Sequence, residues 1–168
     1  FPYTTLFRSP LILFPFAFVF GGVAQLICGF YAFRARDGVA VAAHGTWGSF
    51  WIGWGILQLL IATHVIPAIA LGSTNDAFGF WFISLTVITV SAALGAMGRN
   101  IAVSLTLWTL AAGSALTAAG FIAGNLGLDR AGGWLFVISA GIAWYTATAM
   151  VMEGGFGRTI LPLGSYKA

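Results

Sequence analysis

Side chains that could bind a polar solute are sparse in this sequence and lie within long apolar runs. Gln25 places a primary amide in the middle of one run, where an amide without a hydrogen-bond partner is costly. It either lines a polar path or holds neighbouring helices together. Further along, Thr106 and Thr117 share one helical face with Leu110, because three- and four-residue steps connect them. Their hydroxyls either line the same path or bond to their own backbone carbonyls.

His44 is the ionisable side chain of greatest interest. Asp37 is a good N-cap, and a helix that begins just after it places His44 one turn before Trp47 on the same face. The imidazole could then sense pH beside that residue. If the helix begins near Thr46 instead, His44 is a solvated loop residue. The sequence leaves both interpretations open.

Acids and metal-binding groups are missing from the centres of the apolar runs. Glu153 stands only at the exit of the last run. Because proton relays in membranes usually carry intramembrane acids, these runs predict a neutral path. The single cysteine, Cys28, excludes a disulfide framework and a multi-cysteine metal site. We expect no catalytic residues, no metal and no cofactor.

The overall composition identifies the environment of the chain. Of its 168 residues, 60% are hydrophobic and only 7% are charged, and the mean hydropathy is +0.97. A soluble domain carries about 25% charged residues, and a chain of this size cannot bury so much apolar surface in water. The composition predicts an integral membrane protein whose surroundings are the lipid bilayer. It excludes an ordinary cytosolic enzyme, a nucleic-acid binder and a disordered chain.

The first nine residues, FPYTTLFRS, look like the in-frame translation of a common sequencing adapter. We therefore set residues 1–9 aside, and Arg8 plays no part in the charge arguments. The native sequence then begins near Pro10, already inside an apolar run. We expect a fragment that lacks its true N-terminus.

The remaining sequence predicts an all-α polytopic membrane protein. A membrane-spanning helix needs about 20 mainly apolar residues. Turn-forming and charged residues separate five such runs, at about 11–33, 39–66, 78–97, 101–124 and 132–152. We expect one transmembrane domain over 10–164, with the residues from 153 to 168 as a C-terminal tail.

Basic residues set the expected orientation, since cytoplasmic connections carry the excess of Lys and Arg. One side of the membrane receives Arg34, Arg36, Arg99, Arg158 and Lys167. The other side receives Arg130, which Asp76 and Asp129 offset. The C-terminus is then cytoplasmic and the first run starts outside. One further helix before it would place both ends in the cytoplasm, so we expect six helices in the complete protein, with the first one missing here.

Four segments match a set of motifs in order and with nearly constant spacing. They are FGGVAQ at Phe20–Gln25 followed by Gly29, WGSFW at Trp47–Trp51, GFIAGN at Gly120–Asn125 and FGRTILPLG at Phe156–Gly164. Over about residues 11–164 the chain thus resembles the succinate–acetate permeases, the SatP/YaaH-like acetate uptake transporters. The NPAPLGL motif of that family's first helix is absent along with the helix.

The resemblance implies a six-helix monomer with a pore through its own bundle, often assembled as a hexamer in the cell membrane. Its implied substrates are small carboxylates, chiefly acetate and also succinate. We expect the substrate pathway to include Phe20, Gln25, His44, Thr106, Thr117 and Asn125. We expect helix packing to use Gly21, Gly22, Gly29, Gly120 and Gly124.

Two positions depart from the family motifs. Trp47 stands where the family has tyrosine, and Phe121 stands where it has the first asparagine of GNIAGN. In the family, that tyrosine narrows the pore together with a first-helix phenylalanine and a fifth-helix leucine. Counting back from the GFIAGN motif places the leucine at Leu110. We therefore expect Trp47 and Leu110 to form an apolar gate, with a bulkier side chain than usual on one side.

Two other functions stay open from the sequence. A short, weakly charged pore would also suit a small neutral solute such as urea. The chain could instead be a membrane scaffold or sensor that transports nothing.

Overall fold

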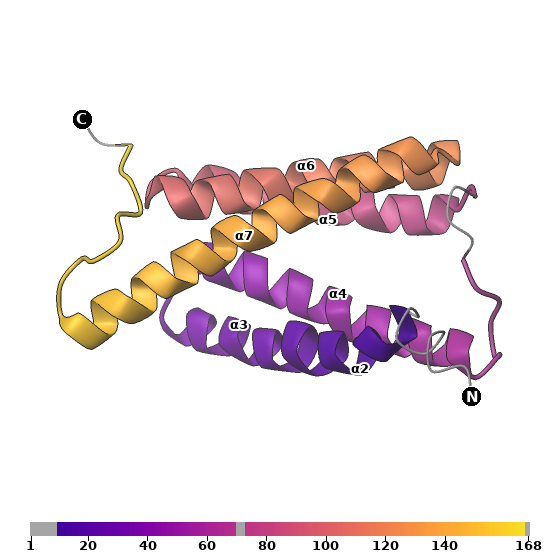
Figure 1. The fold of residues 1–168 in the computed structure, drawn as a ribbon, viewed down its shortest axis with the longest axis horizontal. Coiled ribbons are helices and arrows are strands. Elements are labelled where there is room, and N and C mark those ends of the chain that lie inside the picture. The colour runs from indigo at the N-terminus through magenta and orange to yellow at the C-terminus, as the bar shows by residue number, and fades with distance from the viewer. Residues whose placement is uncertain (1–9, 70–72, 167–168) are drawn as a thin grey trace. The chain divides into compact units, whose positions relative to one another are not determined.

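The computed structural model describes residues 10–69 and 73–166, and every regular element in these ranges is a helix. The chain forms two compact units, Phe1–Ile69 and Ala70–Ala168, and each is considered by itself (Figure 1). The adapter-like residues 1–9 lie outside the described part of the chain.

The first unit is a hairpin of two long helices. Its first arm runs without a break through η1 (Pro10–Leu13), α2 (Phe14–Phe16), η2 (Ala17–Ala24) and α3 (Gln25–Arg34). The chain then reverses and continues as α4 (Gly38–Ala62). Within the first arm, η2 is a π-helix, a rare form that is often found at functional sites.

The start of α4 settles the position of His44. The Asp37 side chain accepts a hydrogen bond of 2.8 Å from the backbone N–H of Ala40, which satisfies one of the unpaired donors of the first turn. The helix therefore begins at Gly38 rather than near Thr46. His44 lies inside the helix, one turn before Trp47, and is half-buried.

Glycines let the two arms of the hairpin touch along their backbones. A methyl group added at Gly48 would lie 2.7 Å from the backbone nitrogen of Leu26. One added at Gly29 would lie 3.1 Å from the nitrogen of Gly45, and one at Gly22 would lie 2.8 Å from the Ile52 side chain. Small residues of this kind allow close helix approach in membranes, so this glycine seam defines the hairpin.

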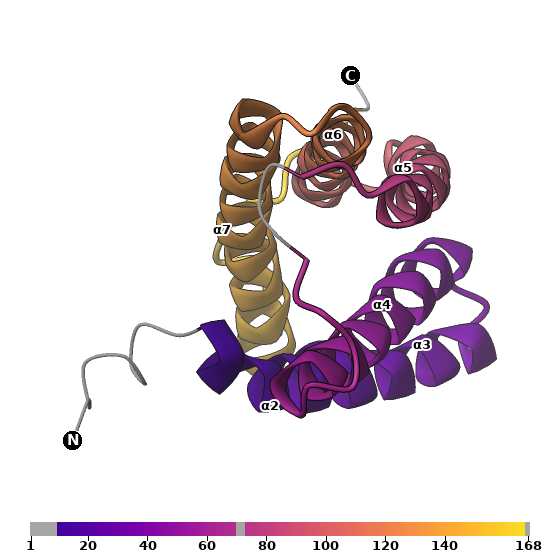
Figure 2. The same ribbon diagram turned by 90° about the vertical axis from the view of Figure 1, so that its right-hand side faces the viewer.

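The second unit holds α5 (Asp76–Ala96), α6 (Ile101–Ala123) and α7 (Leu126–Phe156). Figures 1 and 2 show α5 and α6 side by side, with α7 crossing α6 obliquely. An asparagine caps each helix start. Asn75 accepts from the N–H of Phe78, Asn100 from that of Val103 and Asn125 from those of Gly127 and Leu128.

Four phenylalanines form an aromatic cluster in the core of the second unit. Phe121 of α6 meets Phe78 of α5 edge-on, with ring centroids 4.9 Å apart, and stacks near Phe82 at 6.0 Å. Phe136 of α7 lies 6.4 Å from Phe82. Phe121 is only 8% exposed. The side chain that replaces the family asparagine is thus a core residue of the α5–α6 contact.

The prediction of an all-α membrane protein is confirmed. Four helices are long and apolar enough to cross a bilayer: Phe14–Arg34, Asp76–Ala96, Ile101–Ala123 and Leu126–Phe156. The 25 residues of α4 extend over about 37 Å, which is also sufficient.

Two helix boundaries differ from the sequence prediction. The helix predicted to reach residue 66 ends at Ala62, because His64 takes a left-handed conformation with φ of 60°. The last helix was expected over 132–152 but covers Leu126–Phe156. Asn125 caps the start of α7, in a segment whose polar and charged residues resemble a loop in composition. Gly157 takes the left-handed conformation and ends the helix.

The glycine seam predicts a sharp difference between two alanine substitutions in α4. Gly48→Ala forces the two backbones apart, so we expect it to lower the free energy of unfolding by about 2 kcal/mol. Gly53→Ala is the matched control, because nothing lies within 4 Å of a methyl group added there, and its helix propensity adds up to about 1 kcal/mol. Thermal unfolding in detergent measures both. Equal stability of the two variants would contradict the seam.

The aromatic cluster predicts the cost of removing Phe121. Phe121→Ala leaves a cavity beside the rings of Phe78 and Phe82 and should destabilise the protein by about 3 kcal/mol. Phe80→Ala on the neighbouring helix is the control, since Phe80 is 64% exposed. The same thermal unfolding assay compares them, and an unchanged midpoint for Phe121→Ala would show that the cluster contributes little.

Candidate functional site

The FGGVAQ motif forms the junction between η2 and α3. Gly22 is buried against Ile52, and a methyl group at Gly21 would lie 3.0 Å from the Trp51 ring. Both glycines therefore face α4, as does Gly29. Phe20 is 71% exposed, so within the described hairpin it points away from the glycine seam.

Gln25 begins α3 and is half-buried. Its side-chain amide makes no hydrogen bond to any described residue. An amide among lipid chains needs a hydrogen-bond partner, and no described residue of the hairpin supplies one. Gln25 thus keeps its donors and its acceptor available.

Gln25 and Trp47 both lie next to the glycine seam. The two arms run antiparallel and Gly48 faces the backbone of Leu26, so Gln25 and Trp47 lie on opposite sides of that contact, about 3 Å apart along the hairpin. Trp47 is 5% exposed, and its ring meets Phe50 edge-on with centroids 5.4 Å apart. It is therefore a buried tryptophan and not a lipid-facing one.

His44 lies on α4, one helical turn before Trp47. Its Nδ1 atom is buried and has no hydrogen-bond partner among the described residues. The packing of Gly29 against Gly45 and the His44 carbonyl carbon holds this part of α4 close to α3. Gln25, His44 and Trp47 thus all belong to the first unit, where His44 and Trp47 lie one turn apart on α4.

On α6 the predicted hydroxyls bond to their own helix. Thr106 donates to the carbonyl of Ala102 at 2.9 Å, and Thr117 donates to that of Gly113 at 2.9 Å. The Thr106 carbonyl accepts from the Ser139 hydroxyl of α7 at 2.8 Å. Leu110 is half-buried. The backbone-bonding alternative therefore holds for both hydroxyls in this structure.

The end of α6 differs from what its spacing suggested. Gly120 packs against Asp129 of α7, but Gly124 lies beyond the helix and ends it with φ of 61°. Gly124 is therefore a C-cap rather than a partner of Gly120 in a packing pair. Asn125 uses its side-chain oxygen to cap α7, which leaves only its amide nitrogen free to meet a solute.

Asp129 was not expected to have a buried carboxylate, although the residue as a whole is half-buried. Both of its carboxylate oxygens are buried without a hydrogen-bond partner among the described residues, and they pack against Gly120. The sequence placed Asp129 in a loop, and only the extension of α7 to Leu126 turns it toward α6. A carboxylate in the first turn of a helix is favoured by the helix dipole, which is the signal that could have found it.

The predicted gate residues stand in different units. Trp47 belongs to Phe1–Ile69 and Leu110 to Ala70–Ala168. No three His, Cys, Asp or Glu side chains gather to hold a metal ion in the described ranges.

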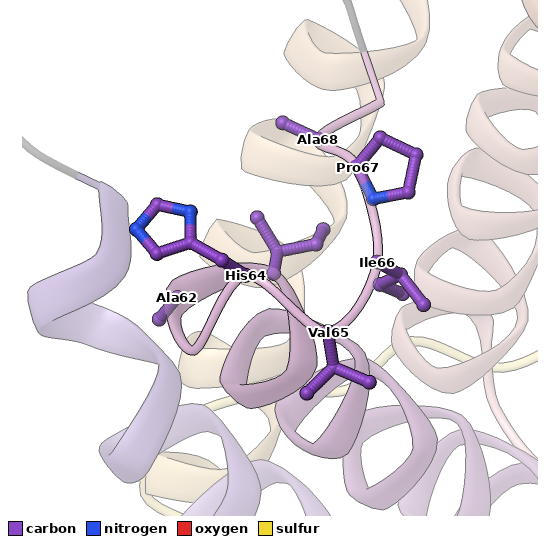
Figure 3. A pocket seen from close by; sticks show the side chains of 7 residues that line it. Ala62, His64, Val65, Ile66, Pro67 and Ala68 are labelled. Atoms are coloured by element: carbon purple, nitrogen blue, oxygen red, sulfur yellow. The ribbon is translucent and has the colours of Figure 1, made fainter.

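A shallow pocket of about 560 Å³ lies beside the chain segment that follows α4 (Figure 3). Its lining comes from Ile61 and Ala62 in the last turn of α4 and from the five residues His64–Ala68. None of the predicted pathway or gate residues lines it, and all of its walls belong to one stretch of chain. It is a surface hollow at a helix end and not a path through the hairpin.

Comparison with known proteins identifies relatives along most of the chain. It is 28% identical over 159 residues to the Escherichia coli protein named succinate-acetate/proton symporter SatP, covering 91% of this chain and 79% of that protein. It is 28% identical over 144 residues to the Saccharomyces cerevisiae ammonia transport outward protein 2, covering 83% of this chain and 50% of the yeast protein.

A solved structure shares the fold. The bacterial acetate channel SatP superposes with a TM-score of 0.80 at 26% sequence identity, covering 91% of this chain and 82% of that chain. The model of the GPR1/FUN34/YaaH family matches residues 5–162. Helical membrane spans, motifs and relatives agree, and the chain belongs to the GPR1/FUN34/YaaH family.

Proposed function

We propose that this protein is a membrane permease or channel for small monocarboxylates, with acetate as the main substrate and succinate as a further one. The observation that carries the proposal is the structural match to the bacterial acetate channel, at a TM-score of 0.80 over 91% of this chain. The name of the Escherichia coli relative, a succinate-acetate/proton symporter, supports the same substrate class.

The chemistry of the site suits a small carboxylate. Gln25 lies within an apolar helix long enough to cross a membrane and offers an amide without a hydrogen bond to any described residue. Amide N–H groups bind carboxylate oxygens without adding a charge to the pore. A neutral path of this kind carries either the undissociated acid or the anion. Phe20, His44 and Asn125 belong to the proposed pathway as well. Thr106 and Thr117 join it through their hydroxyl oxygens, which can still accept a hydrogen bond while they donate to Ala102 and Gly113.

Trp47 and Leu110 are the proposed gate. An apolar constriction resists wetting and closes a pore without any charge. The burial of Trp47 and its place on α4 directly before Gly48 of the glycine seam support this role on the α4 side. The indole ring of Trp47 is wider than the phenol ring of the family tyrosine, and its N–H only donates. We therefore expect the width of the pore at Trp47 to differ from that of the family.

The proposal extends to the surroundings of the protein. We place it as a multi-pass protein in the cell membrane with a cytoplasmic C-terminus, as Arg34, Arg36, Arg99 and Arg158 at one set of helix ends favour. From the resemblance to the permeases, we also propose that the protein assembles as a homohexamer. Residues 10–164 form the proposed transporter domain, followed by the C-terminal tail.

A channel for a small neutral solute is the second candidate. The yeast relative named for ammonia transport supports it, and urea is the probe we choose. Uptake of labelled acetate and of labelled urea into proteoliposomes separates the two functions. Acetate uptake alone supports our proposal, urea uptake alone overturns it, and uptake of neither indicates a scaffold or sensor.

Removal of the Gln25 amide should stop transport without unfolding the protein. A hydrogen bond to a charged group contributes enough that we expect Gln25→Leu to reduce acetate uptake by about tenfold or more. The control is Gln58→Leu, which replaces a half-buried glutamine of α4. Proteoliposome uptake gives the rate, and size-exclusion chromatography checks assembly. A Gln25→Leu variant that transports normally, or that fails to assemble, would contradict a pore-lining role.

Replacement of Trp47 with a smaller side chain should widen the pore rather than block it. We expect Trp47→Ala to raise the uptake of butyrate severalfold relative to acetate, and Trp47→Tyr to keep transport with the narrower side chain of the family. Trp144→Ala is the control, because Trp144 of α7 is 76% exposed. If Trp47→Ala left the butyrate-to-acetate ratio unchanged, Trp47 would not be a gate.

A further inference from the structure

The chain beyond α7 returns to the start of α6. Residues 157–166, here called the C-terminal strap, run from the end of α7 to the first turn of α6 (Figure 1). The Ala102 N–H donates to the carbonyl of Leu163 at 3.0 Å, and the Ile101 N–H donates to that of Gly164 at 3.4 Å. The strap therefore binds a helix N-terminus through its own backbone.

These two hydrogen bonds complete the cap of α6. The first N–H groups of a helix have no partner within it and need one from outside. Asn100 supplies its side-chain oxygen to Val103 at 2.9 Å, which leaves Ile101 and Ala102 to the strap. Without the strap, the cap of α6 is incomplete.

Side chains of α7 hold the strap in place. The Tyr145 hydroxyl donates to the carbonyl of Pro162 at 2.7 Å, one residue before the carbonyls that reach α6. Nearer the start of the strap, the Thr159 hydroxyl lies 3.1 Å from a carboxylate oxygen of Glu153. The strap thus links α7 to the beginning of α6 within one compact unit.

Gly164 fits the contact in a way that a larger residue would not. Its φ is 74°, a conformation that favours glycine. A methyl group added there would also lie 3.0 Å from the Ile101 side chain. Both the conformation and the space at this position serve the docking of the strap on α6.

We propose that the C-terminal strap fixes the first turn of α6 against α7 and thereby sets the selectivity of the pore. Thr106 and Leu110 follow that first turn on the same helix, so a frayed start would loosen their positions. The effect on selectivity rests on the proposed transport function. The effect on the helix start does not.

Tyr145→Phe tests the proposal with the loss of one hydroxyl. Loss of one hydrogen bond should speed amide hydrogen exchange at Ile101 and Ala102 by about fivefold. The butyrate-to-acetate uptake ratio should rise by about two- to threefold. Tyr31→Phe is the matched control, because Tyr31 is exposed in the other unit. Gly164→Ala is a second route to the same release and should show both effects.

The outcomes separate the two halves of the proposal. Unchanged exchange at Ile101 and Ala102 in both variants would show that the strap does not hold α6. Faster exchange with an unchanged uptake ratio would show that the strap caps the helix but has no control over the pore, which overturns the proposal. If the unaltered protein takes up no carboxylate, the proposed function fails, while exchange still decides whether the strap holds the helix.

Discussion

Direct contact between helix backbones is the constraint on which the first unit depends. In a bilayer, burial of apolar surface no longer drives helices together, and close approach through small residues takes its place. At Gly48 the Leu26 backbone comes so near that a single methyl group would not fit. This contact sets the register of the two arms, and with it the positions along the hairpin of Gln25, which precedes Leu26, and of Trp47, which precedes Gly48.

The second unit also has a close glycine contact, and caps and side-chain hydroxyls pair its backbone and side-chain polar groups. Gly132 packs against Thr117 and the carbonyl of Gly113, which lets α7 cross α6 closely. Lipid offers no partner for an unpaired N–H or C=O group. Helix starts therefore carry asparagine caps, and the C-terminal strap supplies carbonyls where Asn100 does not reach. Hydroxyls such as that of Thr106 bond within their own helix.

Much of the fold could be predicted from the sequence because apolar runs and capping residues are local signals. The starts of α5 and α6 follow from turn residues and from capping by Asn75 and Asn100. The length of α7 could not be predicted, because the charged residues Asp129 and Arg130 are typical of a loop. Only the packing of Asp129 against Gly120 shows that this segment belongs to the helix. Spacing likewise suggested a glycine pair on α6, whereas Gly124 takes the left-handed conformation that ends the helix. The relation between Trp47 and Leu110 depends on contacts between distant segments, which no local pattern encodes.

The most direct test of a pore at Gln25 is whether water and acetate reach it. Cys28 is the only cysteine, so Cys28→Ala gives a background in which Gln25→Cys is the single thiol. We predict that a charged, membrane-impermeant thiosulfonate reagent labels this thiol in the reconstituted protein, and that acetate slows the reaction. A thiol at position 25 that stays unlabelled in the folded protein, or that reacts at the same rate with and without acetate, would contradict a carboxylate pathway there.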